Sequence, residues 1–332
     1  MPMKFDQHSK HRLSRREFLY LSSIGAAALS AACSTPISAA RLGSNVARPT
    51  AQRACRIAHL TDFHILPQSF IKDQVAKAFR HVHALEDQPD LILNTGDSIM
   101  DSLKTSKEDA ERQWAAFLEV VAAECKLPIY HAIGNHDVWG WGLQDETIKE
   151  DPSYGKGLAV QKLGLSSPYY AFDYGGWHFI VLDSVHPANA VSKEPYIGKL
   201  DEEQFAWLEK EVQSVPAETP IAIASHIPIL SACELFDGEN EESGNWVIPA
   251  AWVHLDARRF RQLFLDHPNI RLCLSGHTHQ HERIEYLGVT YLSDGAISGN
   301  WWMGNYMNFP PACVIVDLYT DGSVQAQFVE YG

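Results

Sequence analysis

Five stretches of the sequence place Asp, His or Asn directly after an apolar run, and these residue types bind metals and move protons. The stretches are Asp62-Phe63-His64, Gly96-Asp97, Gly134-Asn135-His136-Asp137, His226, and Gly276-His277-Thr278-His279. Alternate residues of an extended segment share one face, so the side chains of His277 and His279 could point toward the same bound group. Oxygen and imidazole donors without thiolate suit Mn, Fe, Zn and similar ions. The residue types therefore predict a metal centre.

The candidate ligands are too numerous for one ion. They are Asp62, His64, Asp97, Asn135, His226, His277 and His279. Such a set suits two ions that share a carboxylate, and Asp97 is the natural bridge. Each residue alone has an ordinary explanation, because Asp62 could cap a turn and His226 could be a hydrogen-bonded core histidine. Five such coincidences in sequence order are improbable, so we favour the metal centre.

Apolar periodicity predicts the elements that must hold these side chains. Strands are expected at residues 56–61, 91–94, 128–133, 169–174, 177–183, 220–225, 270–275, 284–287, 289–293, 313–319 and 323–331, and helices at 70–85, 107–125, 201–213 and 257–266. Residues 137–167 predict a long loop with short helices. The alternation of strands and helices indicates a layered α/β domain of two sheets flanked by helices, in which ligands bind at the carboxyl ends of strands.

The motifs DxH, GD, GNHD, a separate His and GHxH, in this order, resemble the calcineurin-like metallophosphoesterase family. The resemblance spans about residues 56–281 and implies a four-layer α/β/β/α sandwich with two mixed sheets. It implies one metal held by Asp62, His64, Asp97 and His279, and another held by Asp97, Asn135, His226 and His277. The ions would be Fe, Mn or Zn, and the enzyme a metal-dependent phosphoric ester hydrolase.

The same resemblance implies a mechanism, in which a metal-activated hydroxide attacks phosphorus in line with the leaving oxygen. His136 matches no ligand position and looks like the general acid or charge stabiliser. Asp137 beside it would orient and charge the imidazole. His281 falls outside the motif and is expected at the surface, with a position behind the ligands as the less favoured alternative, whereas His59, His131 and His178 are expected to be buried and hydrogen-bonded.

The motifs of this chain differ from those of several branches of the family, and these differences exclude some branches. The chain reads GDSIMD and GNHD rather than the GDxxDRG and GNHE of phosphoprotein phosphatases, and Met100 stands where purple acid phosphatases place a tyrosine. What remains resembles the branch of cyclic-nucleotide and glycerophosphodiester hydrolases (class III). A phosphodiesterase is therefore expected, with a broad-specificity phosphomonoesterase as the alternative. A nuclease and a non-catalytic binding module are weaker alternatives.

Two further segments could shape the substrate pocket. Residues 235–242 are acidic and form either a lid or a solvated loop. Residues 298–306, SGNWWMGNY, carry aromatic side chains between glycines. These aromatics could stack on a base or cover an apolar leaving group, or the tryptophans could pack as core.

The N-terminus and the net charge bear on location and partners. The formal net charge of −14 makes nucleic acid an unexpected partner.

Residues 14–19, SRREFL, precede the short apolar run of residues 20–32 and resemble a twin-arginine signal. We expect a signal peptide at 1–40, a linker at 41–53 and a catalytic domain at 54–332. The twin-arginine export machinery would then be a partner, and the enzyme would be periplasmic or secreted, without a stable membrane span. Lipid attachment at Cys33 is a less favoured alternative.

Overall fold

The computed structural model describes residues 51–188 and 192–331, all within the unit that runs from Ile37 to Gly332. The strands are β1 (Arg53–Leu60), β2 (Leu91–Asn94), β3 (Ile129–His131), β4 (Tyr170–Tyr174), β5 (Trp177–Val181), β6 (Val185–Pro187), β7 (Tyr196–Gly198), β8 (Ile221–Ala224), β9 (Ile270–Ser275), β10 (Glu282–Tyr286), β11 (Val289–Ser293), β12 (Ala312–Tyr319) and β13 (Val324–Glu330). The helices are α2 (Ser69–His83), α3 (Lys107–Glu124), α4 (Gly157–Leu163), α5 (Glu202–Ser214), α6 (Ala257–Asp266) and the short 3-10 turns η2 (Glu146–Glu150) and η3 (Cys233–Leu235).

Two mixed sheets form the centre of the fold. One has the strand order β13-β12-β1-β2-β3 and the other β10-β11-β9-β8-β5-β4, while β6 and β7 form a separate hairpin. Within each sheet the inner strands run parallel, with β1 beside β2, β2 beside β3, β5 beside β8 and β8 beside β9. Parallel strands covered on both faces read as continuous apolar runs, and β2 and β8 are buried at every position.

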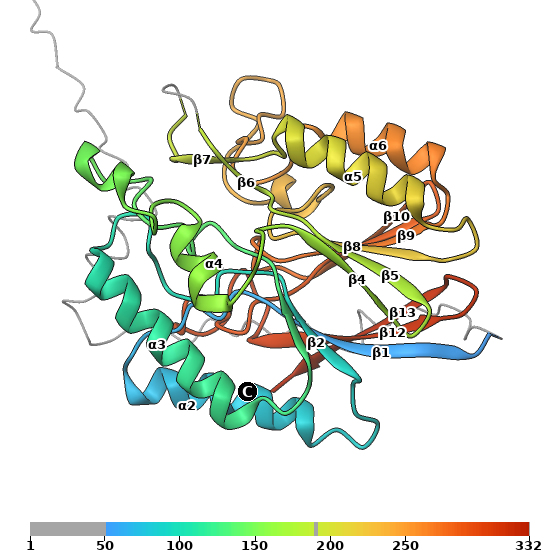
Figure 1. Ribbon diagram of the computed structural model, residues 1–332, viewed down its shortest axis with the longest axis horizontal. Coiled ribbons are helices and arrows are strands. Elements are labelled where there is room, and N and C mark those ends of the chain that lie inside the picture. Colours follow the sequence, from blue (N-terminus) through green and yellow to red (C-terminus); the bar gives the residue numbers. More distant parts are fainter. Residues whose placement is uncertain (1–50, 189–191, 332) are drawn as a thin grey trace, which may run out of the picture. The chain divides into compact units, whose positions relative to one another are not determined.

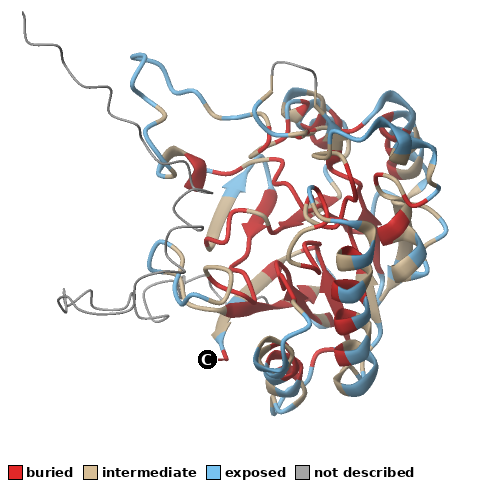
Figure 2. Ribbon diagram, turned by 90° about the vertical axis from the view of Figure 1, so that its left-hand side faces the viewer, coloured by how far each residue is buried: buried red, intermediate tan, exposed pale blue. Residues whose placement is uncertain are grey.

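The helices cover the outer faces of the two sheets, so the molecule has four layers. In Figure 1, α2 and α3 lie against the smaller sheet, whereas α5 and α6 lie against the larger one. Three apolar clusters fill the three interfaces, represented by Phe79 and Phe117 under the smaller sheet, Leu93 and Phe179 between the sheets, and Phe260 outside the larger sheet. Figure 2 shows the strands of both sheets as mostly buried. The predicted α/β/β/α sandwich is therefore confirmed.

Local sequence signals explain where the helices begin. The side chain of Ser106 accepts a hydrogen bond from the backbone N–H of Asp109 at the start of α3, and Asp201 accepts one from Gln204 at the start of α5. The apolar residues of α5 recur at helical spacing, so Phe205, Leu208 and Val212 are buried on one face.

The bounds of the predicted strands and of the predicted long helices agree with the structure to within one to three residues. The third strand is limited to Ile129–His131, the hairpin of β6 and β7 was not expected, and β1 begins at Arg53, inside the predicted linker. The predicted signal peptide (1–40) and residues 41–50 of the linker lie outside the described residues. None of the helices in the described part of the chain is long and apolar enough to cross a membrane.

Candidate metal centre

The seven predicted ligands come from loops that follow five strands at their carboxyl ends. Asp62 and His64 follow β1, and Asp97 and Asn135 follow β2 and β3 of the same sheet. His226 follows β8, and His277 and His279 follow β9 of the facing sheet. Backbone hydrogen bonds tie the loops together, because the N–H of His64 donates to the carbonyl of Asp97 at 3.0 Å. The two sheets thus bring all seven side chains to one place.

The first group of ligands consists of Asp62, His64 and His279. Nε2 of His64 lies 3.0 Å from Nε2 of His279, and that nitrogen lies 3.2 Å from Oδ1 of Asp62. Nε2 of His64 lies 3.7 Å from the same carboxylate oxygen. Three donor atoms from two sheets therefore converge within the space that one cation and its ligands would occupy.

The second group consists of Asn135, His226 and His277. Nε2 of His226 lies 2.9 Å from Oδ1 of Asn135 and 3.2 Å from Nδ1 of His277. This group combines an amide oxygen with two imidazole nitrogens, which is the donor chemistry of a borderline transition metal such as Mn, Fe or Zn.

Asp97 lies between the two groups. Its Oδ2 is 3.6 Å from Nε2 of His64 in the first group and 3.2 Å from Nε2 of His226 in the second. Its other oxygen accepts a hydrogen bond from the backbone N–H of His136 at 2.8 Å, which fixes the plane of the carboxylate. A single oxygen atom of Asp97 therefore faces both groups, as a bridging ligand requires.

Five of the seven ligands have a left-handed backbone conformation. The φ angles are 52° for Asp62, 43° for His64, 51° for Asp97, 72° for His277 and 55° for His279. Each such residue costs about 1–3 kcal/mol unless its surroundings fix it, and such strain concentrates at functional sites. The fold therefore holds these loops in unfavourable backbone conformations that position the ligand side chains.

Backbone carbonyls fix which nitrogen of each imidazole faces the centre. Nδ1 of His226 lies 3.0 Å from the carbonyl of Thr95, Nε2 of His277 lies 2.9 Å from that of Ala251, and Nδ1 of His279 lies 2.6 Å from that of Gly299. A carbonyl only accepts hydrogen bonds, so each of these nitrogens carries a proton. The other nitrogen of each ring then points inward, and such outer hydrogen bonds orient metal-binding histidines.

The residues present fit the pair of cations that the fold implies. Oδ1 of Asp62 is buried and accepts no hydrogen bond from any described residue, while its Oδ2 accepts from Thr61 and from the backbone of His277. Such an orphaned buried oxygen would be costly without a cation. Burial also lowers the pKa of His64 to about 4 and that of His277 to about 3, so both rings are neutral and offer a lone pair.

Two glycines let the ligand loops approach one another. A Cβ on Gly276 would overlap the Thr61 hydroxyl and the Asp62 carboxylate, and a Cβ on Gly134 would overlap the Asp97 carboxylate. Neither glycine can therefore carry a side chain without displacing a ligand.

His136 lies at the open edge of the centre, with its side chain 27% exposed and its ring 4.8 Å from that of His64. Burial disfavours its protonation, but Asp97 and Asp101 outweigh that effect and raise its pKa to about 9. In the metal-free protein the imidazole is thus protonated at neutral pH, which suits a proton donor or a positive charge beside a leaving oxygen.

The carboxylate of Asp137 does not contact the imidazole of His136 that it was predicted to orient. Its Oδ1 accepts from the backbone N–H groups of Ser98 and Ile99 and its Oδ2 from that of Gly134, because the side chain turns back under its own loop. Asp101 is the carboxylate beside the imidazole, with Oδ1 3.6 Å from Nδ1 of His136. Asp137 adds to the raised pKa of His136 only through its charge.

The structure also corrects the place of His281. Its side chain is only 8% exposed, packs on Phe328 and lies 3.6 Å from the buried carboxylate of Asp294, so the predicted surface position is wrong. Asp294 in turn contacts His59, whose Nε2 lies 2.7 Å from the hydroxyl of Thr95. His131 and His178 are buried and hydrogen-bonded, as predicted.

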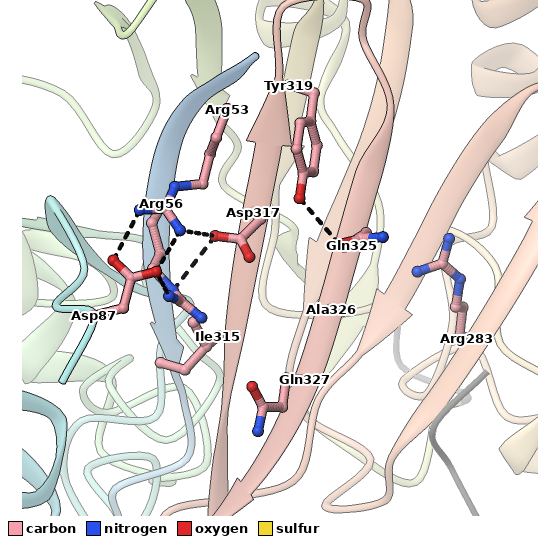
Figure 3. A pocket seen from close by; sticks show the side chains of 10 residues that line it. All are labelled: Arg53, Arg56, Asp87, Arg283, Ile315, Asp317, Tyr319, Gln325, Ala326 and Gln327. Atoms are coloured by element: carbon pink, nitrogen blue, oxygen red, sulfur yellow. Dashed lines mark hydrogen bonds and ion pairs between the residues drawn. The ribbon is translucent and has the colours of Figure 1, made fainter. Parts of the chain in front are cut away.

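A cavity of about 510 Å³ lies away from this centre, on the outer face of β1, β12 and β13. Figure 3 shows that Arg53 and Arg56 are paired there with Asp87 and Asp317. None of the seven ligands lines this cavity, and its charges are matched, so it has no part in the chemistry of the centre.

Comparisons with known proteins agree with the geometry. The sequence profile of the calcineurin-like phosphoesterase family matches residues 55–281. A 3′,5′-cyclic-nucleotide phosphodiesterase of Nostoc sp. is 26% identical over 247 residues, which is 71% of this chain and 76% of the relative. The 3′,5′-cyclic adenosine monophosphate phosphodiesterase of Escherichia coli strain K12 is 24% identical over 249 residues, 72% of this chain and 74% of the relative.

A solved structure shows the same fold. A dimetal phosphatase from Danio rerio superposes with a TM-score of 0.55 at 12% identity, covering 85% of this chain and 100% of that one. The family match spans the region in which all seven ligands lie, from β1 to the loop after β9. The chain therefore belongs to the calcineurin-like phosphoesterase family and is a hydrolase.

Proposed function

We propose that this protein is an exported phosphodiesterase with a dinuclear metal centre. The observation that supports the proposal most directly is Oδ2 of Asp97, which faces both ligand groups at once. One ion would be held by Asp62, His64, Asp97 and His279, and the other by Asp97, Asn135, His226 and His277. The donor set accepts Mn, Fe or Zn, so the choice of metal is left to measurement.

When bound, a pair of cations supplies an activated water and stabilises the charge that develops on the attacking and leaving oxygens. The chain's own residues supply the rest. The carbonyls of Thr95, Ala251 and Gly299 hold the imidazoles in place, so the ligands need little reorganisation when substrate binds.

His136 is proposed to protonate the leaving oxygen or to stabilise its charge. Its protonated imidazole stands at the open edge of the centre and beside the first ligand group. Asp101 is proposed as its positioning residue. Because the Asp101 carboxylate also accepts the backbone N–H of Leu103 at 3.0 Å, its own place is fixed by the loop that carries it.

The preference for a diester rests on the relatives and on charge. Two curated relatives that cover more than 70% of this chain are named as cyclic-nucleotide phosphodiesterases. The net charge of −14 disfavours substrates with several negative charges, and a diester carries one. The same charge argues against a nucleic-acid substrate.

A rate comparison tests the proposal. The metal-loaded enzyme should show a higher kcat/KM for bis-p-nitrophenyl phosphate than for p-nitrophenyl phosphate. A preference for the monoester would replace the phosphodiesterase by the broad-specificity phosphomonoesterase. No turnover of either ester, with two metals bound per chain, would indicate a non-catalytic binding module and overturn the proposal.

Export is proposed from the twin-arginine-like residues 14–19 and the apolar run that follows them, which lie outside the described residues. Intact-mass measurement of the protein recovered from outside the cytoplasm tests it. A chain that begins near Arg41 supports cleavage after residues 38–40, and a mass that includes an acyl group on Cys33 supports the lipoprotein alternative. A full-length chain found only in the cytoplasm contradicts export.

A further inference from the structure

The loop of residues 298–306, here called the aromatic loop, is bound to the ligand loops at several points. The backbone N–H of Ser298 donates to the carbonyl of Asp62 at 3.1 Å, and the carbonyl of Gly299 lies 2.6 Å from Nδ1 of His279. The indole N–H of Trp302 donates to the carbonyl of His64 at 2.9 Å. The aromatic loop is therefore fixed relative to the first ligand group, and its side chains have a defined place beside it.

The two tryptophans of the loop take different roles. Trp302 packs against the apolar cluster beneath the smaller sheet, so this tryptophan is part of the core, as one of the two alternatives predicted. The ring of Trp301 lies 4.3 Å from that of His279 at an interplanar angle of 30°, and 5.7 Å from that of His64. Trp301 is partly exposed, whereas both imidazoles are buried. Trp301 thus forms a wall of the centre with one part in contact with solvent.

Tyr306 completes a corner with Trp301. The two rings lie 5.7 Å apart at 89°, and the ring of Tyr306 lies 5.7 Å from that of His279. The phenol hydroxyl donates to Oδ2 of Asp237 at 3.1 Å, so the acidic segment 235–242 is attached to this corner. Two perpendicular rings, both partly exposed and both beside a metal ligand, offer a face and an edge to a flat group.

The backbone conformation of the aromatic loop supports a role of this loop in ligand binding. Trp301 has a φ of 46° and Trp302 a φ of 69°, a conformation that bulky residues rarely adopt. Strain of this kind persists where the surroundings hold it and concentrates at ligand sites. Packing alone would not require two adjacent tryptophans in this conformation, since Trp302 already anchors the loop to His64.

The surroundings of the corner limit what it can bind. Phe236, Met303 and Met307 are exposed by 72%, 54% and 40%, so the two segments joined at the corner carry apolar side chains on their surface. Asp237, Glu239, Glu241 and Glu242 in the neighbouring segment add negative charge. Exposed apolar side chains and negative charge on these segments favour a flat, uncharged group and disfavour further phosphates.

We infer that Trp301 and Tyr306 bind a planar aromatic group, of the kind a nucleobase presents, on the substrate's phosphate ester. This inference deepens the proposed function and rests on it, because the aromatic group must be linked to the phosphoryl group at the same centre. Trp301 is then a specificity-determining residue, and the enzyme discriminates among phosphodiesters by the group that stacks on its ring.

The first test compares two phosphates that differ in the base. Calorimetry on the manganese-loaded enzyme should give a Kd for adenosine 5′-phosphate roughly tenfold below that for ribose 5-phosphate. In Trp301→Leu the ratio should fall close to one, through weaker binding of adenosine 5′-phosphate alone. Trp301→Phe keeps a ring and should restore most of the ratio. Trp246→Leu, a change at an exposed tryptophan outside the corner, should leave the ratio unchanged.

The inference is overturned if wild-type protein binds both phosphates equally, or if Trp301→Leu weakens both by the same factor. Rates separate this failure from that of the proposed function. Thymidine 5′-p-nitrophenyl phosphate and methyl p-nitrophenyl phosphate share a leaving group, and Trp301→Leu should raise KM roughly tenfold for the first and leave the second unchanged. If both diesters are hydrolysed and Trp301→Leu changes their KM values equally, the corner does not bind the base, but the protein is still a phosphodiesterase. If neither diester is hydrolysed while adenosine 5′-phosphate still binds more tightly than ribose 5-phosphate, the corner binds the base, but the protein is not a phosphodiesterase.

Discussion

Asp97 and His226 meet across the two sheets, with Oδ2 of the carboxylate 3.2 Å from Nε2 of the imidazole. The same oxygen lies 3.6 Å from Nε2 of His64, which belongs to the other ligand group. Asp97 is therefore the one side chain among the seven ligands whose loss should affect both metal positions. In the proposed assignment, each of the remaining ligands serves one position.

Asp97→Asn should abolish most metal binding and activity. The amide keeps the shape of the side chain but removes the negative charge that two neighbouring cations require. We expect less than one metal per chain by inductively coupled plasma mass spectrometry, and a fall in kcat/KM of at least a thousandfold. Asp321→Asn, at the turn between β12 and β13, is the matched control and should retain both metals. Two tightly bound metals in Asp97→Asn would contradict the bridging role.

His136→Ala should keep both metals and lose most turnover. The imidazole is not among the seven ligands, its ring lies 4.8 Å from that of His64, and Asp97 and Asp101 raise its pKa against burial in the metal-free protein, which suits a proton donor. The loss should be large for esters with a poor leaving group and small for p-nitrophenyl esters, which need no proton. Equal losses for both kinds of ester would remove proton donation from its role.

Asp101→Asn and Asp137→Asn separate the two carboxylates near His136. We expect Asp101→Asn to reproduce part of the His136→Ala effect on poor leaving groups, because Asp101 contacts the imidazole. Asp137→Asn should mainly lower the melting temperature, because the carboxylate of Asp137 accepts three backbone N–H groups. The opposite pattern in rates and melting temperatures would restore the original assignment to Asp137.

Gly276→Ala should lose metal without a large loss of stability elsewhere. The added Cβ overlaps the Thr61 hydroxyl and the Asp62 carboxylate, so the first ligand group must shift. Affinity for the first metal should fall by at least tenfold in a competitive chelator titration. Gly164→Ala, where the Cβ meets no atom, controls for the glycine change itself, although its positive φ costs some stability. Unchanged metal affinity in Gly276→Ala would show that the loop can move away.

His131 should make the apo-protein less stable in acid. Burial lowers its pKa to about 4, whereas the unfolded chain has a value near 6.5, so protons bind preferentially to the unfolded state between these values. Stability is thus lost as the pH falls from about 6.5 to 4, by up to about 3 kcal/mol for this group. Urea unfolding of wild type and His131→Gln at pH 7.5 and 5, both without metal, measures the difference. Parallel pH profiles would contradict it.

The sequence was sufficient to predict the layers and to place the candidate ligands at the ends of strands, because both follow from local patterns. Buried parallel strands are continuous apolar runs, and each ligand follows such a run within a few residues, as Asp62 follows β1 and His226 follows β8. Periodicity therefore places the ends of the strands, and the motifs place the ligands on those ends.

Contacts between distant segments could not be predicted in this way. Asp101 and Asp137 are both close to His136 in sequence, and only the direction in which the loop turns decides which carboxylate meets the imidazole. A surface position is expected for His281 because it falls outside the ligand motif, and the sequence does not show that Asp294, which follows the different strand β11, is its partner. The hairpin of β6 and β7 was missed because each strand has only three residues, too few for a periodic signal.

The most direct test of the dinuclear centre is anomalous diffraction from crystals of the manganese-loaded enzyme. We expect two manganese peaks about 3.5–4 Å apart, with Oδ2 of Asp97 between them. Asp62, His64 and His279 should surround one peak, and Asn135, His226 and His277 the other. A single peak, or two peaks that do not share Asp97, would contradict the account.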